Sequence, residues 1–579
     1  MGNRLPYSFS RFIFFVIVFF TAIPTYATHI FGVDLYYKHV AGNTYTIHLV
    51  MYGDCSGAAF GSFPTSVPVV NVYNGNTFIN AVSLTLQTPT TGVEVTPVCP
   101  ADAALTTCTN PAFTIPGVKK FVYTANTTLS GPSTVWRFLF QGSMGVGGAA
   151  GRSSTITNIT TPGSTLIQLV DTLNNTTYNN SNAVYTTIPT PFFCLGIPAN
   201  FNPGAVDPDG DSLAFYLVPG VDASTGTSVN YIFPYTATAP LAATPGTFSF
   251  SATTGQLSFT PNLLQRSLVV YNVEEYHSGA LRGTSQREMT VVVLTCTSTP
   301  PFGSISGATA GTVTSPTTLD ICDNVGPYSF HINPTSPGGY HITMTASGIP
   351  AGATFNIVGN GTLAPLGTFS WTTTGIAPGA YIFYITFQDD GCPLSGIQTI
   401  AYTINVLPIP SETFSLVSPA TCIKKAVFHV TPGGSASPWT IKVIQSGTTI
   451  QTLTGVIGMV TDSLIPGTYT IRIINPGNCF ADTVITLAAP PLPVASGITT
   501  TPPLCPGGST GSATITATGG LPPYLYAIGT GTYTTSDIFT GLTPGSYMLH
   551  VKDANGCVKD TLIAVPNATP ILMNIIVKK

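Results

Sequence analysis

The chain has 579 residues, a formal net charge of −4 and only 7% charged residues, against roughly 25% in an ordinary soluble protein. So few lysines and arginines exclude a nucleic-acid-binding protein, which needs them to neutralise phosphates, and they exclude a coiled coil, whose flanking positions are charged. A hydrophobic fraction of 44% excludes acidic disorder. The 58 glycines and 49 prolines predict an all-β chain of strands and turns, with about four or five domains.

The N-terminus has the features of a secretory signal peptide. Two arginines precede an apolar run at 12–20, which is shorter than the roughly 20 residues of a membrane-spanning helix. The tripeptide Thr-Tyr-Ala predicts cleavage before Thr28, so that 1–27 is removed. The alternative is an uncleaved membrane anchor. No later apolar run is long enough to cross a bilayer, so we expect a secreted or cell-surface protein whose cysteines form disulfides.

Three larger β domains are expected to follow. The first is an N-terminal β domain over 28–197. The pentapeptide Gly-Thr-Phe-Ser-Phe at 246–250 returns as Gly-Thr-Phe-Ser-Trp at 367–371, and each copy stands in a unit that closes with an apolar strand. We therefore expect two immunoglobulin-like or cadherin-like sandwiches, at 198–298 and 299–408, since turn signals recur at short intervals.

An acidic turn in the second domain is the strongest candidate for a metal site. Asp207, Asp209 and Asp211 alternate around Gly210, and carboxylates on a flexible loop can supply some of the six to eight oxygens that Ca²⁺ takes. The segment is not an EF-hand, because Val218 stands where the bidentate glutamate belongs. Calcium is therefore the candidate cofactor. The alternative is a β-turn that the aspartates cap without any metal.

Two shorter modules are expected at 409–488 and 489–568, before a tail at 569–579. Each contains a related phrase, Leu-Ile-Pro-Gly-Thr-Tyr at 464–469 and Leu-Thr-Pro-Gly-Ser-Tyr at 542–547. Each phrase predicts a Pro-Gly turn that leads into an alternating strand, and an Asp-Thr-Val/Leu strand follows. The repetition indicates units of similar fold arranged in tandem.

The spacing of the 11 cysteines predicts one disulfide in each module. The expected pairs are Cys99–Cys108, Cys322–Cys392, Cys422–Cys479 and Cys505–Cys557. Cys55, Cys194 and Cys296 remain, and this odd number predicts one further pair and one free thiol. In the chain-entropy treatment each disulfide contributes roughly 3 to 4 kcal/mol, so reduction is expected to melt the two C-terminal modules.

No arrangement of residues predicts a catalytic site. The Gly-x-Ser-x-Gly spacing at 507–511 is followed by an alternating pattern at 512–518, whereas the elbow of a serine hydrolase leads into a helix. Glu274 and Glu275 are adjacent, so on a strand their side chains face opposite ways and cannot line one cleft. The eight histidines lack the spacing of a helical zinc site. We expect no catalytic residues.

Three segments of the last module carry a family resemblance. They are Gly-Gly-Leu-Pro-Pro-Tyr at 519–524, the phrase at 541–547 and Val-Lys-Asp-Ala-Asn-Gly-Cys at 551–557. This module resembles the SprB-type repeat of the large surface adhesins of gliding bacteroidete bacteria, and 422–487 resembles it more loosely. Blocks between 28 and 298 are similar to the opening of other long secreted proteins of those bacteria. The resemblance implies export, a surface location and a role connected with adhesion or gliding motility.

These observations together predict a non-enzymatic, adhesin-like modular protein that is secreted or displayed on a cell surface. Its expected partner is a surface glycan or protein. We expect no nucleic-acid partner, and no membrane-spanning segment once the signal peptide has been removed. One alternative is a secreted enzyme that acts on polysaccharides through a catalytic domain within 28–197. Another is a purely structural spacer.

Overall fold

The computed structural model describes residues 27–57, 60–145, 148–323 and 325–570. Strands make up almost all of its regular structure, so the predicted all-β class is confirmed. The expected signal peptide lies outside these residues except for Ala27, and most of the expected tail does too. None of the described helices is long and apolar enough to cross a membrane. The short 3-10 helices include η1 (Phe60–Thr65), η2 (Pro100–Leu105) and η4 (Pro162–Ser164).

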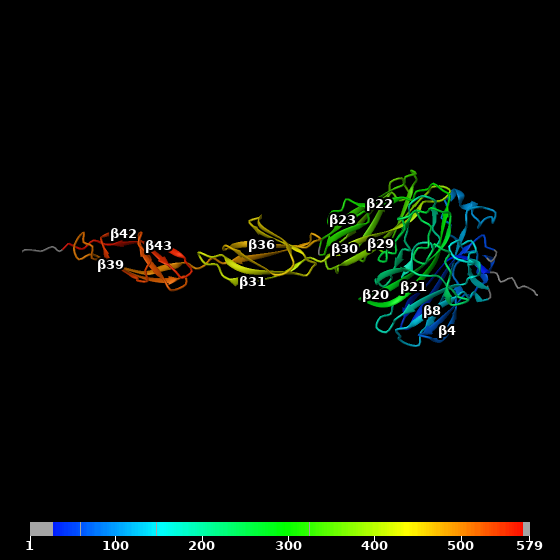
Figure 1. Cartoon of the computed structure of the whole chain (residues 1–579), viewed down its shortest axis with the longest axis horizontal. Helices are drawn as coiled ribbons and strands as arrows, with labels where there is room; N and C mark the ends of the chain where they lie inside the picture. Colours follow the sequence, from blue (N-terminus) through cyan, green and yellow to red (C-terminus); the bar gives the residue numbers. More distant parts are fainter. Residues whose placement is uncertain (1–26, 58–59, 146–147, 324, 571–579) are drawn as a thin grey trace, which may run out of the picture. The chain divides into compact units, whose positions relative to one another are not determined.

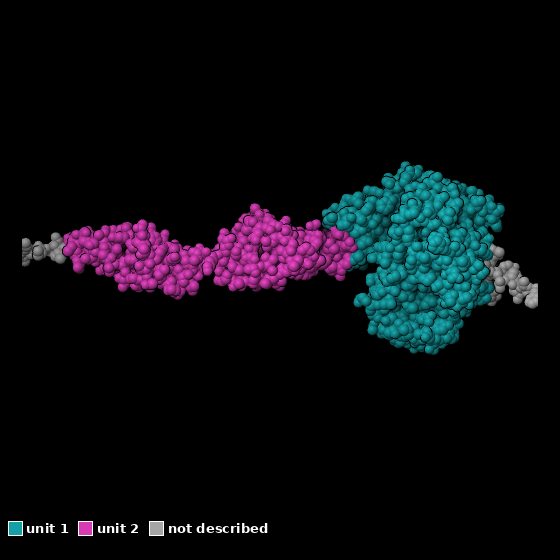
Figure 2. Space-filling view, viewed as in Figure 1, with its two compact units in different colours: residues 1–319, 327–372, 380–404 teal, residues 320–326, 373–379, 405–579 magenta. Residues whose placement is uncertain are grey.

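The chain divides into two compact units, which Figure 2 colours separately. Unit 1 comprises 1–319, 327–372 and 380–404, and unit 2 comprises 320–326, 373–379 and 405–579. Two strands, β24 (Thr318–Cys322) and β30 (Ile397–Leu407), begin in unit 1 and end in unit 2. The expected domain at 299–408 is therefore not a compact unit of its own.

The largest sheet of unit 1 joins strands from distant parts of the sequence (Figure 1). Its main path runs β4 (Thr77–Ser83), β3 (Val69–Asn74), β8 (Trp136–Gln141), β10 (Ile167–Leu173), β21 (Ala280–Leu294), β1 (Ala27–Ala41), β2 (Thr44–Asp54), β7 (Val118–Thr128) and β5 (Thr85–Leu86). Its other strands are β6 (Val93–Glu94), β9 (Ala149–Arg152), β12 (Phe192–Cys194), β15 (Ser212–Leu217), β16 (Val221–Asp222), β17 (Thr227–Ser228) and β20 (Arg266–His277). Two smaller sheets contain β11 (Val184–Tyr185) with β14 (Ala205–Val206), and β13 (Ala199–Phe201) with β18 (Ser249–Phe250) and β19 (Leu257–Phe259).

Strand β21 shows that the expected boundary at 197/198 does not separate two sheets. β21 pairs with β1 and with β10, which both belong to the expected N-terminal domain. Two buried ion pairs fix this arrangement. Arg287 on β21 meets Asp34 on β1 at 2.7 Å, and Glu288 meets Arg152 at 2.7 Å. Charges buried this deeply are tolerated only when paired, so the middle of the chain is built into the N-terminal sheet.

Strand β2 is buried on both faces along its second half, because the sheet is covered on each side. Leu49 and Met51 belong to one hydrophobic cluster, together with Trp136. Val50 and Tyr52 point the other way, into a second cluster. A sheet covered on both sides requires continuous rather than alternating apolar residues, which explains the unbroken run that ends this strand.

The region after β21 forms two further sheets. Four aromatic rings from both sheets fill the space between them: Phe330 stacks on Phe369 with centroids 4.8 Å apart, Phe369 on Phe383 at 5.1 Å, and Phe383 on Tyr402 at 5.4 Å. This packing is that of a β-sandwich. One sheet contains β22 (Phe302–Ser306), β25 (Tyr328–Thr335), β28 (Leu366–Trp371) and β27 (Thr354–Val358), and the other contains β23 (Thr312–Ser315), β24, β30, β29 (Gly379–Asp389) and β26 (Ile342–Ser347).

Unit 2 contains four small sheets, two formed by strands of 411–487, here called the first module, and two formed by strands of 493–565, here called the second module. The first module has β31 (Ser411–Ser418), β32 (Ala426–Gly433) and β35 (Val460–Leu464) in one sheet, and β34 (Thr448–Val456), β33 (Trp439–Gln445), β36 (Gly467–Ile474) and β37 (Phe480–Leu487) in the other. The second module has β38 (Pro493–Thr501), β39 (Gly511–Gly519) and β41 (Ile538–Leu542), and then β40 (Leu525–Ile528), β42 (Gly545–Lys552) and β43 (Val558–Val565).

The repeated Pro-Gly-x-Tyr phrase has the same structural role in both modules. The hydroxyl of Tyr469 donates to the carbonyl of Ile465 at 3.0 Å, and the hydroxyl of Tyr547 donates to the carbonyl of Thr543 at 2.9 Å. Each tyrosine therefore spans the turn that precedes its own strand. The aspartates of the following strand also correspond, since Asp482 pairs with Arg472 and Asp560 pairs with His550.

The disulfides differ from all four expected pairings. Cys99 is not bonded to Cys108, nor Cys322 to Cys392, nor Cys422 to Cys479, nor Cys505 to Cys557. Of the three cysteines left over, Cys194 and Cys296 pair, but Cys55 is not the free thiol. The free thiol is Cys505, which is exposed. The bonds are Cys55–Cys108, Cys99–Cys392, Cys194–Cys296, Cys322–Cys479 and Cys422–Cys557.

Strand direction explains why the expected pairing within a module is impossible. Cys422 lies in the loop that leads into β32. β35 returns antiparallel to β32, and β36 then runs away from the Cys422 end. The turn after β36, which carries Cys479, therefore lies at the opposite end of the module. Cys422 instead forms a disulfide with Cys557, which lies in the corresponding turn of the next module. The backbone N–H of Cys422 also donates to the backbone carbonyl of Asn555 at 3.2 Å.

Candidate functional site

Unit 1 contains a cavity of about 170 Å³, which is a candidate for a ligand site. Four separate parts of the chain line it: Pro97, the segment 186–192, strand β13, and the facing strands β29 and β30. A volume of this size holds on the order of ten water molecules. None of the described residues that line it is charged.

The polar groups of the cavity are amides and hydroxyls. The amide of Asn200 donates to the side-chain carbonyl of Gln398 at 3.1 Å, and Gln398 donates to the backbone carbonyl of Pro301 at 2.7 Å. These bonds fix both amide planes. The hydroxyls of Thr386 and Thr399 are hydrogen-bonded to each other at 2.7 Å. One of the two donates in this bond, and the hydrogen of the accepting hydroxyl is not used in it.

Thr190 stands out among the lining residues. Its side chain is 1% exposed, and its hydroxyl has no hydrogen-bond partner in the described part of the chain. A buried polar group without a partner costs roughly 1 to 3 kcal/mol.

The apolar part of the cavity comes from Ile188, Phe192, Phe201 and Ile397. Rings and branched chains of this kind accept the apolar face of a ligand, while the amides and hydroxyls orient it. The absence of charge among the lining residues disfavours phosphate or carboxylate ligands, which require a positive partner. The cavity is therefore suited to an uncharged ligand that carries hydroxyl groups.

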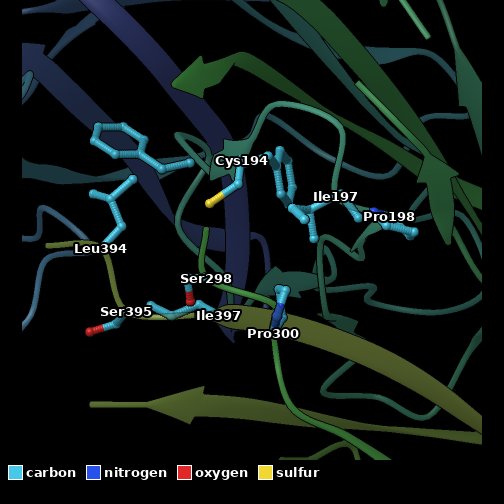
Figure 3. Close-up of a pocket in the computed structure, with 12 residues that line it drawn as sticks. Cys194, Ile197, Pro198, Ser298, Pro300, Leu394, Ser395 and Ile397 are labelled. Carbon is cyan, nitrogen blue, oxygen red and sulfur yellow. The ribbon is translucent and has the colours of Figure 1, made fainter. Parts of the chain in front are cut away.

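A second, much smaller cavity lies next to Cys194 (Figure 3). Figure 3 shows Ile197 and Pro198 on one side of it and Leu394 and Ile397 on the other. Its volume is about 10 Å³, which is close to the minimum for a single water molecule. This space cannot accept a ligand.

The acidic turn at 207–211 connects β14 to β15. One carboxylate oxygen of Asp207 accepts backbone N–H groups from Asp209 at 2.9 Å and from Asp211 at 3.0 Å. Asp209 accepts the backbone N–H of Ser181 at 2.6 Å. The expected capped turn is therefore present, and Asp209 is used to hold a neighbouring loop.

Asp211 and Asp207 each keep one oxygen that the turn does not use. Nδ1 of His277 lies 2.7 Å from Oδ1 of Asp211, and the His277 ring stacks on Tyr178 with centroids 4.0 Å apart. Oδ2 of Asp207 and Oδ2 of Asp211 are buried without a partner in the described residues. Burial, and the nearby charge of Asp211, raise the pKa of Asp207 to about 7.

The three aspartates do not converge as a metal cluster. Among the described residues, one group of three or more ligand atoms lies within 4.8 Å of one another, and it consists of Cys99, Asp102 and Cys392. Its two cysteines are joined in a disulfide, so they cannot bind a metal. The acidic turn therefore offers two free carboxylate oxygens rather than three.

The two adjacent glutamates face opposite ways, as the sequence predicts. Glu274 accepts a hydrogen bond from the hydroxyl of Tyr276 at 2.6 Å. Glu275 is fully buried and accepts bonds from Asn180 at 2.6 Å, Asn182 at 3.1 Å and the backbone of Ala183 at 2.8 Å. Burial raises the pKa of Glu275 to about 8.

The serine at the centre of the Gly-x-Ser-x-Gly spacing leads into a strand, as expected. Ser509 lies just before β39, which begins at Gly511. The sequence did not identify the residues of the cavity. They come from four parts of the chain up to about three hundred positions apart, and nothing in the local pattern at Thr190, Asn200 or Gln398 indicates that they meet.

Comparison with protein families confirms part of the predicted resemblance. A family model described as the SprB repeat matches residues 497–533, which lie in the last module. No curated protein matches the chain. The chain is therefore a multidomain β protein with a SprB-type repeat.

Solved structures with tandem β domains show weak similarity. Drosophila OTK extracellular domains 3–5 share 13% identity over 53% of this chain and 97% of theirs, with a TM-score of 0.21. Human desmocollin-1 ectodomain shares 9% over 70% and 86%, with a TM-score of 0.16. The C-terminal fragment of intimin, solved with its receptor domain, shares 12% over 35% and 68%, with a TM-score of 0.20. These scores are too low to support an inference.

Proposed function

We propose that this chain is a non-enzymatic, adhesin-like surface protein that binds an uncharged glycan unit in the cavity of unit 1. The observation that carries the proposal is the lining of this cavity, which combines amides, hydroxyls and apolar side chains without a charged residue. A sugar ring offers hydroxyls to such polar groups and an apolar face to Phe192 and Phe201.

A surface location is supported by two independent observations. Ten of the 11 cysteines are paired, and disulfides persist in oxidising compartments outside the cytosol. The last module matches the SprB repeat. The signal peptide predicted at 1–27 would provide the route of export.

Glycan binding is tested with the whole chain from Thr28 onward, on an array of neutral and charged glycans followed by calorimetry. We expect neutral glycans to bind. Thr190→Val removes the hydroxyl while keeping the shape, and we expect it to weaken binding about tenfold, as for the loss of one buried hydrogen bond. Thr290→Val is the matched control, because Thr290 is also 1% exposed with an unpartnered hydroxyl but does not line the cavity.

Three outcomes would count against this proposal. They are no neutral glycan bound at millimolar concentration, equal weakening by the two threonine variants, and a preference for charged glycans. The same samples test the enzymatic alternative, since shortened polysaccharide products would indicate catalysis rather than binding alone.

We also propose that Ca²⁺ binds at the acidic turn through the free oxygens of Asp207 and Asp211. Their burial without partners is the supporting observation, and Ca²⁺ would complete its shell with backbone oxygens and water. Millimolar calcium is then expected to raise the melting temperature of the wild type. The Asp211→Asn variant is expected to lose this rise, whereas Asp320→Asn, a remote control, keeps it. A melting temperature that calcium leaves unchanged would refute the site.

A further inference from the structure

Four of the five disulfides enclose stretches of the chain that overlap in succession, and the first of them, Cys55–Cys108, spans 53 positions. Cys99–Cys392 spans 293 positions, Cys322–Cys479 spans 157 and Cys422–Cys557 spans 135. Each loop begins before the previous one has closed.

The disulfides shorten the covalent path through the molecule. When every module has unfolded, a crosslinked chain can extend only as far as the shortest route along backbone and disulfide bonds. From Thr28 to Pro570 this route contains roughly 80 residues, or roughly 30 nm when fully extended, against roughly 540 residues and 180 to 190 nm for the reduced chain. The route crosses Cys55–Cys108, then Cys99–Cys392, then Cys422–Cys557.

We infer that this chain is a tension-bearing tether whose extension is capped by its disulfides. Under load, an ordinary tandem β protein lengthens each time a module unfolds. Here the load passes to covalent bonds before most of the chain is released, so unfolding adds little length. This function is independent of the ligand, since it follows from the connectivity of the cysteines alone.

The remaining two disulfides both lie off this shortest route. Cys194–Cys296 lies inside the loop that Cys99–Cys392 closes, so it carries no load while that bond is intact. Cys322–Cys479 overlaps both neighbouring loops and also lies off the shortest route. It becomes part of the route when either neighbouring bond is broken, which makes it a reserve crosslink.

Single-molecule force spectroscopy on the chain 28–570, held at its two ends, tests this inference. We expect the oxidised wild type to stop extending near the contour of roughly 80 residues, and the dithiothreitol-reduced protein to reach roughly 540. The double variant Cys422→Ala/Cys557→Ala is expected to extend to roughly 200 residues. The matched control Cys322→Ala/Cys479→Ala removes a bond of the same kind and is expected to keep the wild-type limit.

The final contour length does not depend on how stable the variants are, because it is measured after all modules have unfolded. A destabilised variant therefore gives lower unfolding forces but the same limit. Peptide mapping of the same samples reports the disulfides directly. Mapping that shows other pairs, or an oxidised chain that extends as far as the reduced one, would overturn the inference, as would a longer limit in the Cys322/Cys479 control.

Discussion

The two units of this protein achieve order in different ways. The sheet of unit 1 depends on pairings between residues far apart in the sequence, and buried ion pairs such as Arg287 with Asp34 lie within it. The modules of unit 2 are formed by neighbouring strands, and their ion pair between Arg472 and Asp482 is about one third exposed. The comparison shows that the long-range strand pairings and the cavity lined by Thr190 occur together in unit 1, whereas unit 2 repeats a locally paired module and joins the two copies by a disulfide.

The largest difference is expected when one partner of an ion pair is removed. Asp34→Asn leaves Arg287 buried without its counter-charge, which typically costs about 3 to 5 kcal/mol. Arg472→Met is the counterpart in unit 2 and is expected to cost less than about 1 kcal/mol, because that pair is exposed to solvent. Urea unfolding of both variants measures the difference. Similar losses in the two units would contradict the comparison.

Loss of the bond between the two modules of unit 2 should have a somewhat smaller effect. We expect Cys422→Ala/Cys557→Ala to lower the stability of unit 2 by about 2 to 4 kcal/mol and to leave the transition of unit 1 unchanged. Differential scanning calorimetry resolves the two transitions. A fall in melting temperature confined to the second module (493–565) would indicate that the disulfide does not couple the two modules.

The unfolding free energy of unit 1 should fall as the pH rises, because of one buried glutamate. The folded protein keeps Glu275 protonated up to about pH 8, while the unfolded chain releases that proton near its ordinary pKa of about 4.3. The unfolding free energy contributed by this group is therefore present at low pH and lost as the pH rises through this window, by up to about 1.4 kcal/mol per unit. Burial raises the pKa of Asp171 in the same direction.

Glu275→Gln is the variant that isolates this contribution. It removes the titrating group, so we expect a smaller slope of unfolding free energy between pH 5 and pH 8, measured by urea titration at several pH values. Glu274→Gln, on the other face of the strand, is the control and should keep the wild-type slope. Equal slopes in the wild type and the Glu275 variant would contradict the assignment.

The smallest effect concerns the repeated tyrosine of unit 2. Tyr469→Phe and Tyr547→Phe each remove one hydrogen bond to a turn carbonyl, which is worth about 0.5 to 1.5 kcal/mol. Tyr469 is almost fully buried, so its variant should lose more than the Tyr547 variant. Thermal melting of the two single variants checks this order.

The all-β class, the turn at 207–211, the opposite faces of Glu274 and Glu275 and the repeated tyrosine phrase could be predicted from the sequence. Each depends on residues within a few positions of one another, because turn chemistry and the two-residue period of a strand are local properties. The SprB-type resemblance at 497–533 likewise rests on a continuous segment.

The disulfide pairing, the place of β21 beside β1 and the cavity around Thr190 were decided by the tertiary structure. The direction of successive strands places Cys422 and Cys479 at opposite ends of one module, and spacing along the chain does not report direction. Strand alternation identifies β21 as a strand but not its partner. Residues brought together across roughly two hundred positions are specified by sheet topology, which no local pattern encodes.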